Sequence, residues 1–305
     1  MNSIAIFINK ILRFGNFKIT EIPQKARREL LTAIEKINRI DTVFVPELIE
    51  LCRKAPGKLI IDSSDNAKYG LTYICRKMKN LKTGGYHSGF KIVLFLWQSG
   101  EQRIPIGFGL WHKQSGSVCD LALAGMSRLR NEFKLRPEVV LADGEYSADK
   151  VVKRLTDYGW AFVFRWRKSR KLSKQRIRNR IPRGYGSSIG LLKNQTKVKI
   201  FRREDRFFET NRMLLQMKDI VRLYKIRWKI EETFKILKHC IGIHRCQQHS
   251  IKAQEVFLWM CMITFSCLEQ MRLLLGDSIY KVKSNVIFQN VNIDNSILKQ
   301  VLAMS

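Results

Sequence analysis

The sequence predicts an α/β protein in which helices flank one mixed β-sheet. Two observations predict it. Three apolar segments within residues 58–113 are joined by turns, which is typical of neighbouring antiparallel strands. Two later apolar segments, at 137–143 and 159–168, alternate with stretches of helical period, which is typical of parallel strands. A chain of 305 residues, 45% of them hydrophobic, can bury such a core, and this composition excludes wholesale disorder.

The first 57 residues are expected to form a small helical region that could contact DNA. The segment PQKARRELLTAIEKINRI carries apolar residues at helical spacing on one side: Leu30, Leu31, Ile34, Ile37 and Ile40. The apolar run before it is interrupted by Asn9 and Lys10 and lacks a small-residue cleavage site, so no signal peptide is expected.

The strands and helices that follow can be assigned in order. KLIIDSSD, GFKIVLFLWQS and RIPIGFGLWHK are the first three strands, with a hairpin turn at SGEQ between the second and third. A helical pattern at 118–133 precedes the buried strand PEVVLADGEYS. A second helical pattern, at 147–158, separates it from the strand GWAFVFRWRK. The resulting order is that of a ribonuclease H-like fold, although other mixed α/β domains share it.

A strongly basic segment follows the last of these strands. Residues 167–190 are rich in lysine and arginine and contain no acid. Such a segment is either a solvated, flexible loop or an insertion that contacts phosphates, and the concentration of like charge favours phosphate contact. TKVKIFRRE and RFFETN are expected to form a hairpin that closes this insertion, at about 168–215.

The charge of the whole chain indicates a polyanionic partner. Lysine and arginine number 56 against 26 acids, a net charge of +30. Nucleic acid is the usual partner of such a surface, with an anionic membrane or ribosomal RNA as alternatives. The seven cysteines show no CxxC motif, which is typical of a reduced, intracellular protein. The longest apolar stretch, at 256–268, is too short to span a bilayer and predicts a buried helix.

Two acids occupy equivalent places in the predicted sheet. Asp62 ends the strand LIID, and Asp143 ends VVLAD. Ligands of mixed α/β sheets bind where the carboxyl ends of strands open into loops, so these acids are a candidate metal-binding pair. Each acid alone could equally cap a turn, because Asp-Ser and Asp-Gly are common in turns.

A third acid lies in YKIRWKIEETFKILK, residues 224–238. No glycine or proline occurs until Gly242, so one helix is expected. The helical period places on one face Tyr224, Arg227, Glu231 and Lys238. A neighbouring apolar stripe is expected to pack on the sheet: Ile226, Ile230, Thr233, Leu237 and Ile241. Glu232 is expected to be a solvated charge on another side.

With these residues in place, the sequence resembles a known family. Tyr-x2-Arg-x3-Glu-x6-Lys is the signature of bacterial insertion-sequence transposases with a DDE triad, and IIDSSD, VVLADGEYS and ETN are similar to that family as well. The resemblance covers roughly residues 55–275. It implies a ribonuclease H-like catalytic domain at 58–275 that contains the insertion, preceded by the helical region 1–57 and followed by a tail at 276–305.

The resemblance also implies a chemistry. In that family three carboxylates hold two Mg²⁺ ions, with Mn²⁺ able to substitute, and the corresponding residues are Asp62, Asp143 and Glu231. The implied reaction is cleavage of double-stranded DNA at transposon ends, followed by strand transfer into target DNA. Arg227 and Lys238 would bind phosphates, and Tyr224 would contact a phosphate or a base, or else pack within the helix.

The implied setting is the bacterial cytoplasm, at the nucleoid, with a homodimer forming on DNA and no membrane partner. Two alternatives remain: a related metal-dependent nuclease without strand transfer, and a basic nucleic-acid-binding protein or decayed transposase without catalysis. A zinc site in HCIGIHRCQQH, residues 239–249, is disfavoured because its spacing fits no common zinc pattern.

Overall fold

The computed structural model describes residues 8–9, 45–68, 74–79, 83–167, 170–181, 184–246 and 250–289. Most of the predicted N-terminal helical region and part of the predicted tail therefore lie outside the described residues. The described part of the N-terminal region includes the helix α4 (Val45–Lys54).

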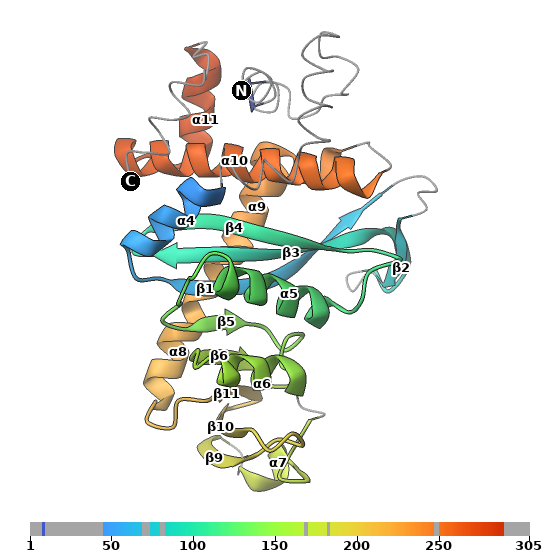
Figure 1. Ribbon diagram of the computed structural model, residues 1–305, viewed down its shortest axis with the longest axis vertical. Helices are drawn as coiled ribbons and strands as arrows, with labels where there is room; N and C mark the ends of the chain where they lie inside the picture. Colours follow the sequence, from blue (N-terminus) through green and yellow to red (C-terminus); the bar gives the residue numbers. More distant parts are fainter. Residues whose placement is uncertain are drawn as a thin grey trace.

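A mixed sheet of nine strands forms the centre of the described structure (Figure 1). Its strands are β1 (Lys58–Ala67), β2 (Arg76–Lys79), β3 (Tyr86–Ser99), β4 (Gln102–Trp111), β5 (Val140–Ala142), β6 (Phe162–Arg165), β9 (Tyr185–Leu191), β10 (Lys197–Arg203) and β11 (Arg206–Thr210). Their order is β2-β3-β1-β5-β6-β11-β10-β9, with β4 also paired to β3.

The strand directions confirm the prediction. β3 is antiparallel to both β1 and β4, whereas β1, β5 and β6 are mutually parallel. The path β4-β3-β1-β5-β6 is that of a ribonuclease H-like core. Residues 59–61, 140–142 and 162–164 are all fully buried, as expected for strands covered by helices on both faces. The short strand β2 was not predicted from the sequence.

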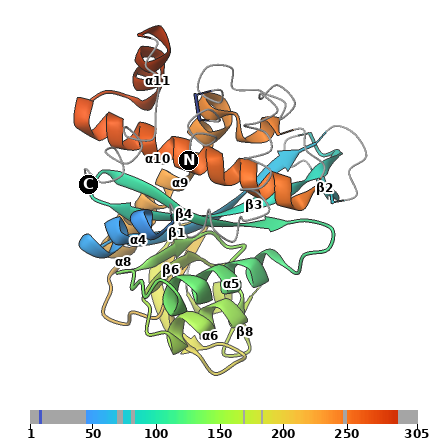
Figure 2. The ribbon, with the colours of Figure 1, turned by 45° about the horizontal axis from the view of Figure 1, so that its top comes forward.

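Helices cover the two faces of this sheet (Figures 1 and 2). On one face lie α5 (Val118–Asn131) and α6 (Asp149–Asp157), and on the other lie α8 (Met217–Ile226) and α9 (Trp228–Ile236). A capping box begins α5: the Ser117 backbone N–H donates to the Asp120 carboxylate at 2.9 Å, and the Asp120 N–H donates to the Ser117 hydroxyl at 3.2 Å.

The prediction of one helix over residues 224–238 is wrong in its continuity. α8 ends at Ile226, Arg227 forms a turn, and α9 begins at Trp228. The Arg227 N–H donates to the Tyr224 carbonyl at 3.2 Å, three residues back, so the backbone tightens at this point. After α9, the π-helix η3 (Leu237–Ile241) ends at Gly242, whose φ of 87° suits glycine.

The predicted apolar stripe nevertheless faces the core. Ile230, Thr233, Leu237 and Ile241 are fully buried, and Ile226 is partly buried. Packing of this stripe on the sheet therefore sets the orientation of α9, although the backbone around it is not one regular helix.

The predicted buried helix is α10 (Ile251–Leu275), which begins at the Ser250 cap and ends at Gly276. By length and composition it is the one helix of the described chain that could cross a membrane, but 78% of its apolar window is buried within the protein. It packs against β4 and α11 (Ile279–Phe288), and Figure 1 shows it lying across one end of the sheet. These contacts are those of a core helix, as predicted.

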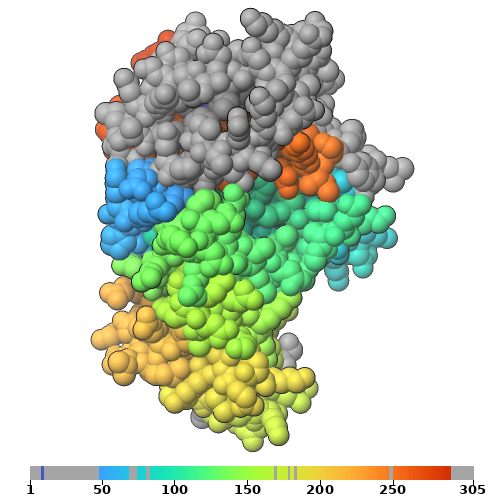
Figure 3. Space-filling view, viewed as in Figure 1, coloured from blue at the N-terminus to red at the C-terminus, as the bar shows by residue number. Residues whose placement is uncertain are grey.

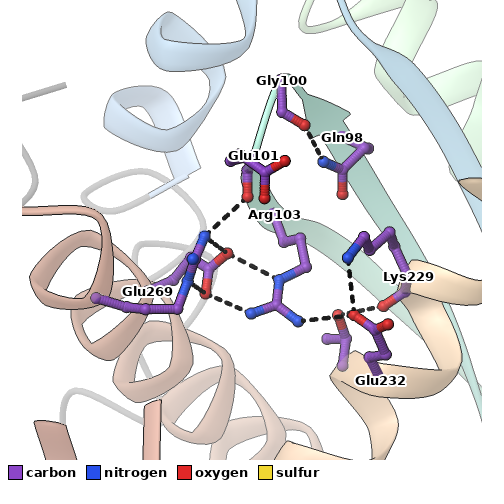
Figure 4. A network of polar contacts seen from close by, with 9 residues as sticks. Gln98, Gly100, Glu101, Arg103, Lys229, Glu232 and Glu269 are labelled. Atoms are coloured by element: carbon purple, nitrogen blue, oxygen red, sulfur yellow. Dashed lines mark hydrogen bonds and ion pairs between the residues drawn. The ribbon is translucent and has the colours of Figure 1, made fainter. Parts of the chain in front are cut away.

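A buried charge network joins α10 to the rest of the core (Figure 4). Arg103 of β4 donates to the two oxygens of the fully buried Glu269 at 2.8 and 2.7 Å, and Arg272 donates to the same carboxylate. Glu232 lies 3.6 Å from Arg103 and 3.1 Å from Lys229. Glu232, whose side chain is 38% exposed, is a solvated charge as predicted, and it also extends this network to α9.

The basic segment is folded over its described residues, which contradicts the flexible-loop interpretation. It forms a hairpin of β7 (Lys171–Leu172) and β8 (Gln175–Arg176), then α7 (Ile177–Arg180) and β9. The predicted hairpin is confirmed as β10 and β11, and β11 pairs with β6, so the insertion continues the central sheet. Figure 3 shows the insertion at one end of the molecule.

A second buried ion pair lies within the insertion, and its arginine also contacts the core. Arg170 Nη1 donates to both oxygens of the fully buried Glu209, at 3.0 and 2.9 Å, and Nη2 donates to Asp149 at 2.6 Å. The guanidinium also lies 4.1 Å from the ring of Trp166, which is 3% exposed. Trp166, which borders the basic segment, is therefore a packing residue and presents no face to a nucleic-acid base.

Candidate active site

The two predicted acids lie on neighbouring strands. β1 and β5 are parallel, and Ile61 pairs with Ala142, so Asp62 and Asp143 follow at adjacent positions. Asp143 ends β5 as predicted, but the prediction that Asp62 ends its strand is wrong, because β1 continues to Ala67 and Asp62 pairs with Leu94 of β3. Asp62 accepts a hydrogen bond from the Ser63 N–H at 2.8 Å, and Asp143 accepts one from the Glu145 N–H at 2.7 Å. The turn contact considered as an alternative is therefore present at Asp143 but not at Asp62, which lies within β1.

Arg227 connects this pair to the third acid. Its Nη1 donates to Asp62 Oδ2 at 2.5 Å, and its Nη2 donates to Glu231 Oε1. Arg227 and Glu231 are four residues apart and share a helix face, as the sequence predicted. The side chain of Arg227 is 12% exposed, that of Asp62 is 15% exposed and that of Glu231 is 36% exposed. The guanidinium therefore lies in a half-enclosed position between two carboxylates.

Burial shifts the titration of both aspartates. Burial, with a smaller contribution from the nearby carboxylates Asp143 and Glu231, raises the pKa of Asp62 to about 7, although Arg227 and the Ser63 N–H both lower it. Burial also raises the pKa of Asp143, opposed by the hydrogen bond from the Glu145 N–H. This part of the sheet is thus a place where negative charges lose hydration and repel one another.

The carboxylates of the site are chemically suited to bind a divalent cation. Carboxylate oxygens are the ligands that Mg²⁺ prefers. A bound cation would offset the desolvation and the mutual repulsion that raise the pKa values of both aspartates. Across the described ranges, no three Asp, Glu, His or Cys side chains are already clustered tightly enough to hold a metal ion. At Asp62 and Glu231, the cation that the structure contains is the Arg227 guanidinium.

The other two signature residues make mainly structural contacts. The Tyr224 ring lies edge-on to Phe208 with centroids 4.9 Å apart, and the Arg227 guanidinium lies 5.3 Å from it. Burial raises the pKa of Tyr224. Lys238 donates to the Asp65 carbonyl at 3.1 Å, which connects η3 to the later part of β1. The packing role considered for Tyr224 is therefore present.

A fourth acid near the site was not singled out from the sequence. Glu145 accepts hydrogen bonds from the Ser63 hydroxyl at 2.9 Å and from Lys91 at 3.1 Å, and its N–H holds Asp143. Its side chain thus links the residue after Asp62 to the loop after Asp143. The only indication of this role in the sequence was that Glu145 comes two residues after Asp143.

A basic cleft of about 650 Å³ opens beside Arg227 and Glu231. Cations from three elements line it: Arg165 of β6, Arg203 and Arg206 of the β10–β11 hairpin, and Lys225 of α8. Trp228, 58% exposed, and Glu204 complete much of the lining. The cleft has the charge expected for binding a nucleic-acid backbone. Its insertion-derived cations lie outside residues 167–190, where phosphate contact was expected.

The described part of the His/Cys segment shows no metal-binding arrangement. Cys240 and Cys246 are buried, and burial raises the pKa of the Cys240 thiol. No metal-binding group is present among its described residues, while residues 247–249 lie outside them.

The fold and the site together define a class of protein. The ribonuclease H-like sheet carries one acid within its first core strand and one directly after its fourth, and a later helix carries a third, which is the arrangement that the resemblance to DDE transposases implies. Within that class, residues 53–267 match the family model described as a transposase DDE domain. The match covers more than two thirds of the chain, and the protein belongs to this family.

One solved structure supports the fold. The piggyBac transposase, in a synaptic complex with hairpin DNA, matches with a TM-score of 0.53 and 14% identity, over 98% of this chain and 71% of that chain. Human endonuclease V and the NurA nuclease of Sulfolobus solfataricus match at 13% and 12% identity, over 84% and 88% of this chain and 99% of each of theirs. Their TM-scores of 0.28 are too low to support an argument. No curated protein matches the sequence.

Proposed function

We propose that the protein is a bacterial insertion-sequence transposase that cuts DNA at the ends of its element and joins them to target DNA. One observation carries the proposal. In a member of the transposase DDE family, Asp62 and Asp143 occupy adjacent positions on the parallel strand pair β1 and β5, and Arg227 links Asp62 to Glu231.

The three carboxylates are proposed to hold two Mg²⁺ ions, which Mn²⁺ can replace. When bound, the ions would activate the attacking oxygen and stabilise the leaving oxygen of a displacement at phosphorus. The ligands would be Asp62, Asp143 and Glu231. Glu145 acts through its N–H, which holds the Asp143 carboxylate in place at 2.7 Å.

The remaining residues of the site bind and orient the DNA. The cations of the basic cleft attract the phosphate backbone. Arg227 lines that cleft and can present its planar fork to a phosphate, and Lys238 is proposed as a second phosphate contact. The Tyr224 ring contacts the Arg227 guanidinium and helps to hold it in position. The proposed partner is double-stranded DNA, bound by a homodimer in the cytoplasm.

The test uses the full-length protein and a duplex that carries the ends of its element, found as inverted repeats flanking the coding region. Asp62→Asn, Asp143→Asn and Glu231→Gln should each abolish Mg²⁺-dependent cleavage and leave DNA binding intact. Glu232→Gln is the matched control, since it changes the adjacent acid and should still cleave. Retained cleavage in any of the three variants would sink the assignment.

Strand transfer needs its own assay. A pre-cut element end offered with a target duplex should give a joined product. Cleavage of the intact end without any joining of the pre-cut end would favour a metal-dependent nuclease. Unchanged activity in the Asp143→Asn variant would favour the non-catalytic alternative.

A further inference from the structure

Arg227 occupies the position between two proposed metal ligands. Its two terminal nitrogens are divided between them, Nη1 on Asp62 and Nη2 on Glu231. A guanidinium that bridges two carboxylates neutralises part of their charge and occupies one oxygen of each, Asp62 Oδ2 and Glu231 Oε1. In this arrangement, a divalent cation must compete with Arg227 for both residues.

Arg227 also lies at the boundary with the basic cleft. It lines the cleft together with Glu231, and Arg165, Arg203 and Arg206 supply further positive charge there. Its buried Nε has no hydrogen-bond partner among the described residues. A buried donor without a partner has a free-energy cost, so the guanidinium is incompletely satisfied in this position, and the cleft that Arg227 lines is the side from which a phosphate can approach the side chain.

We propose that Arg227 is an exchangeable counter-ion that couples metal binding to DNA binding. Without DNA, it is held by Asp62 and Glu231 and weakens their affinity for a divalent cation. A DNA phosphate that enters the cleft takes the guanidinium as its own partner, which releases the two carboxylates to the metal. Metal and DNA therefore bind cooperatively, and each raises the affinity for the other by the same factor.

This inference rests on the proposed function, because it takes Asp62 and Glu231 as metal ligands. As a consequence, the protein becomes competent for cleavage only when a phosphate already occupies the cleft.

The test measures Mn²⁺ binding to the DNA-free, full-length protein by titration calorimetry and by the electron paramagnetic resonance signal of free Mn²⁺. Arg227→Gln should bind Mn²⁺ at least about tenfold more tightly than the wild type, because charge-assisted hydrogen bonds no longer compete. Lys225→Gln is the matched control. It removes one positive charge from the same cleft, two residues away, and should change the affinity by less than about twofold.

The outcomes separate this inference from the proposed function. Equal Mn²⁺ affinities of Arg227→Gln and the wild type, or an equal gain in Lys225→Gln, would overturn the exchange while leaving Asp62 as a ligand. Adding Asp62→Asn to Arg227→Gln should remove the gain. If Asp62→Asn has no effect on Mn²⁺ binding, the proposed metal site itself is wrong.

A second variant covers the case in which Arg227→Gln does not fold. Arg227→Lys keeps the charge but cannot bridge two carboxylates with a planar fork. It should bind Mn²⁺ with an affinity between those of the wild type and a fully released site. An affinity no higher than that of the wild type would count against the exchange.

Discussion

The Asp62 carboxylate should destabilise the fold of the metal-free protein. Its pKa is about 7 in the folded protein against an ordinary value of 3.8, mainly because of burial. The folded state therefore binds an extra proton between these pH values, and the contribution of Asp62 to stability is present below pH 3.8 and is lost as the pH rises to about 7. This pKa difference corresponds to an upper limit of about 4 kcal/mol.

Asp62→Asn removes the titrating group and should raise the free energy of unfolding at alkaline pH. We expect a gain of about 2–4 kcal/mol at pH 8, because Arg227 loses one ionic partner and offsets part of the limit. At pH 5 the gain should shrink to about 1 kcal/mol or less. Urea unfolding followed by circular dichroism, with EDTA present, measures both values.

The matched control is Asp157→Asn, an exposed aspartate at the end of α6 that pairs with Lys153. It should change stability by less than about 0.5 kcal/mol at either pH. The reasoning would be refuted if Asp62→Asn destabilised the protein at pH 8, or if its effect were the same at pH 5 and pH 8.

Two further predictions concern packing of the core. Glu269→Ala leaves Arg103, whose side chain is 8% exposed, without its main partner and should cost about 3–5 kcal/mol in urea unfolding. Arg128→Ala, which breaks an exposed pair, should cost less than about 1 kcal/mol, and equal costs would contradict the buried-network interpretation. Gly125→Ala should cost about 1–3 kcal/mol, since the new methyl group would meet the Phe95 ring of β3. Adding Phe95→Leu should recover part of that loss, and no recovery would point to another cause.

Local features of the chain were predictable because they depend on residues close together in sequence. Apolar runs that end in an acid located β1 and β5, and the turns and helical stretches between strands indicated which neighbours are antiparallel and which are parallel. The period of the helix placed Arg227 and Glu231 on one face. Each of these follows from backbone geometry over a few residues.

Features that depend on contacts between distant segments were not predictable in the same way. The contact of Glu232 with Arg103 was missed, because Arg103 belongs to a strand far away in the chain. The break at Arg227 follows from a tightened backbone that no glycine or proline marks. Trp166 bordered a basic segment, yet Arg170 covers it once the insertion folds onto the core.

The sequence alone therefore determined the fold class, the three candidate carboxylates and the helix face that carries the third. Tertiary structure decided how these parts meet. The parallel register of β1 and β5 places Asp62 beside Asp143, and Arg227 reaches Asp62 across 165 positions of sequence. It also brought the β10–β11 hairpin to the edge of the site, where its arginines form the cleft. Periodicity specifies which way a side chain points, but only the packing of remote elements specifies what it meets.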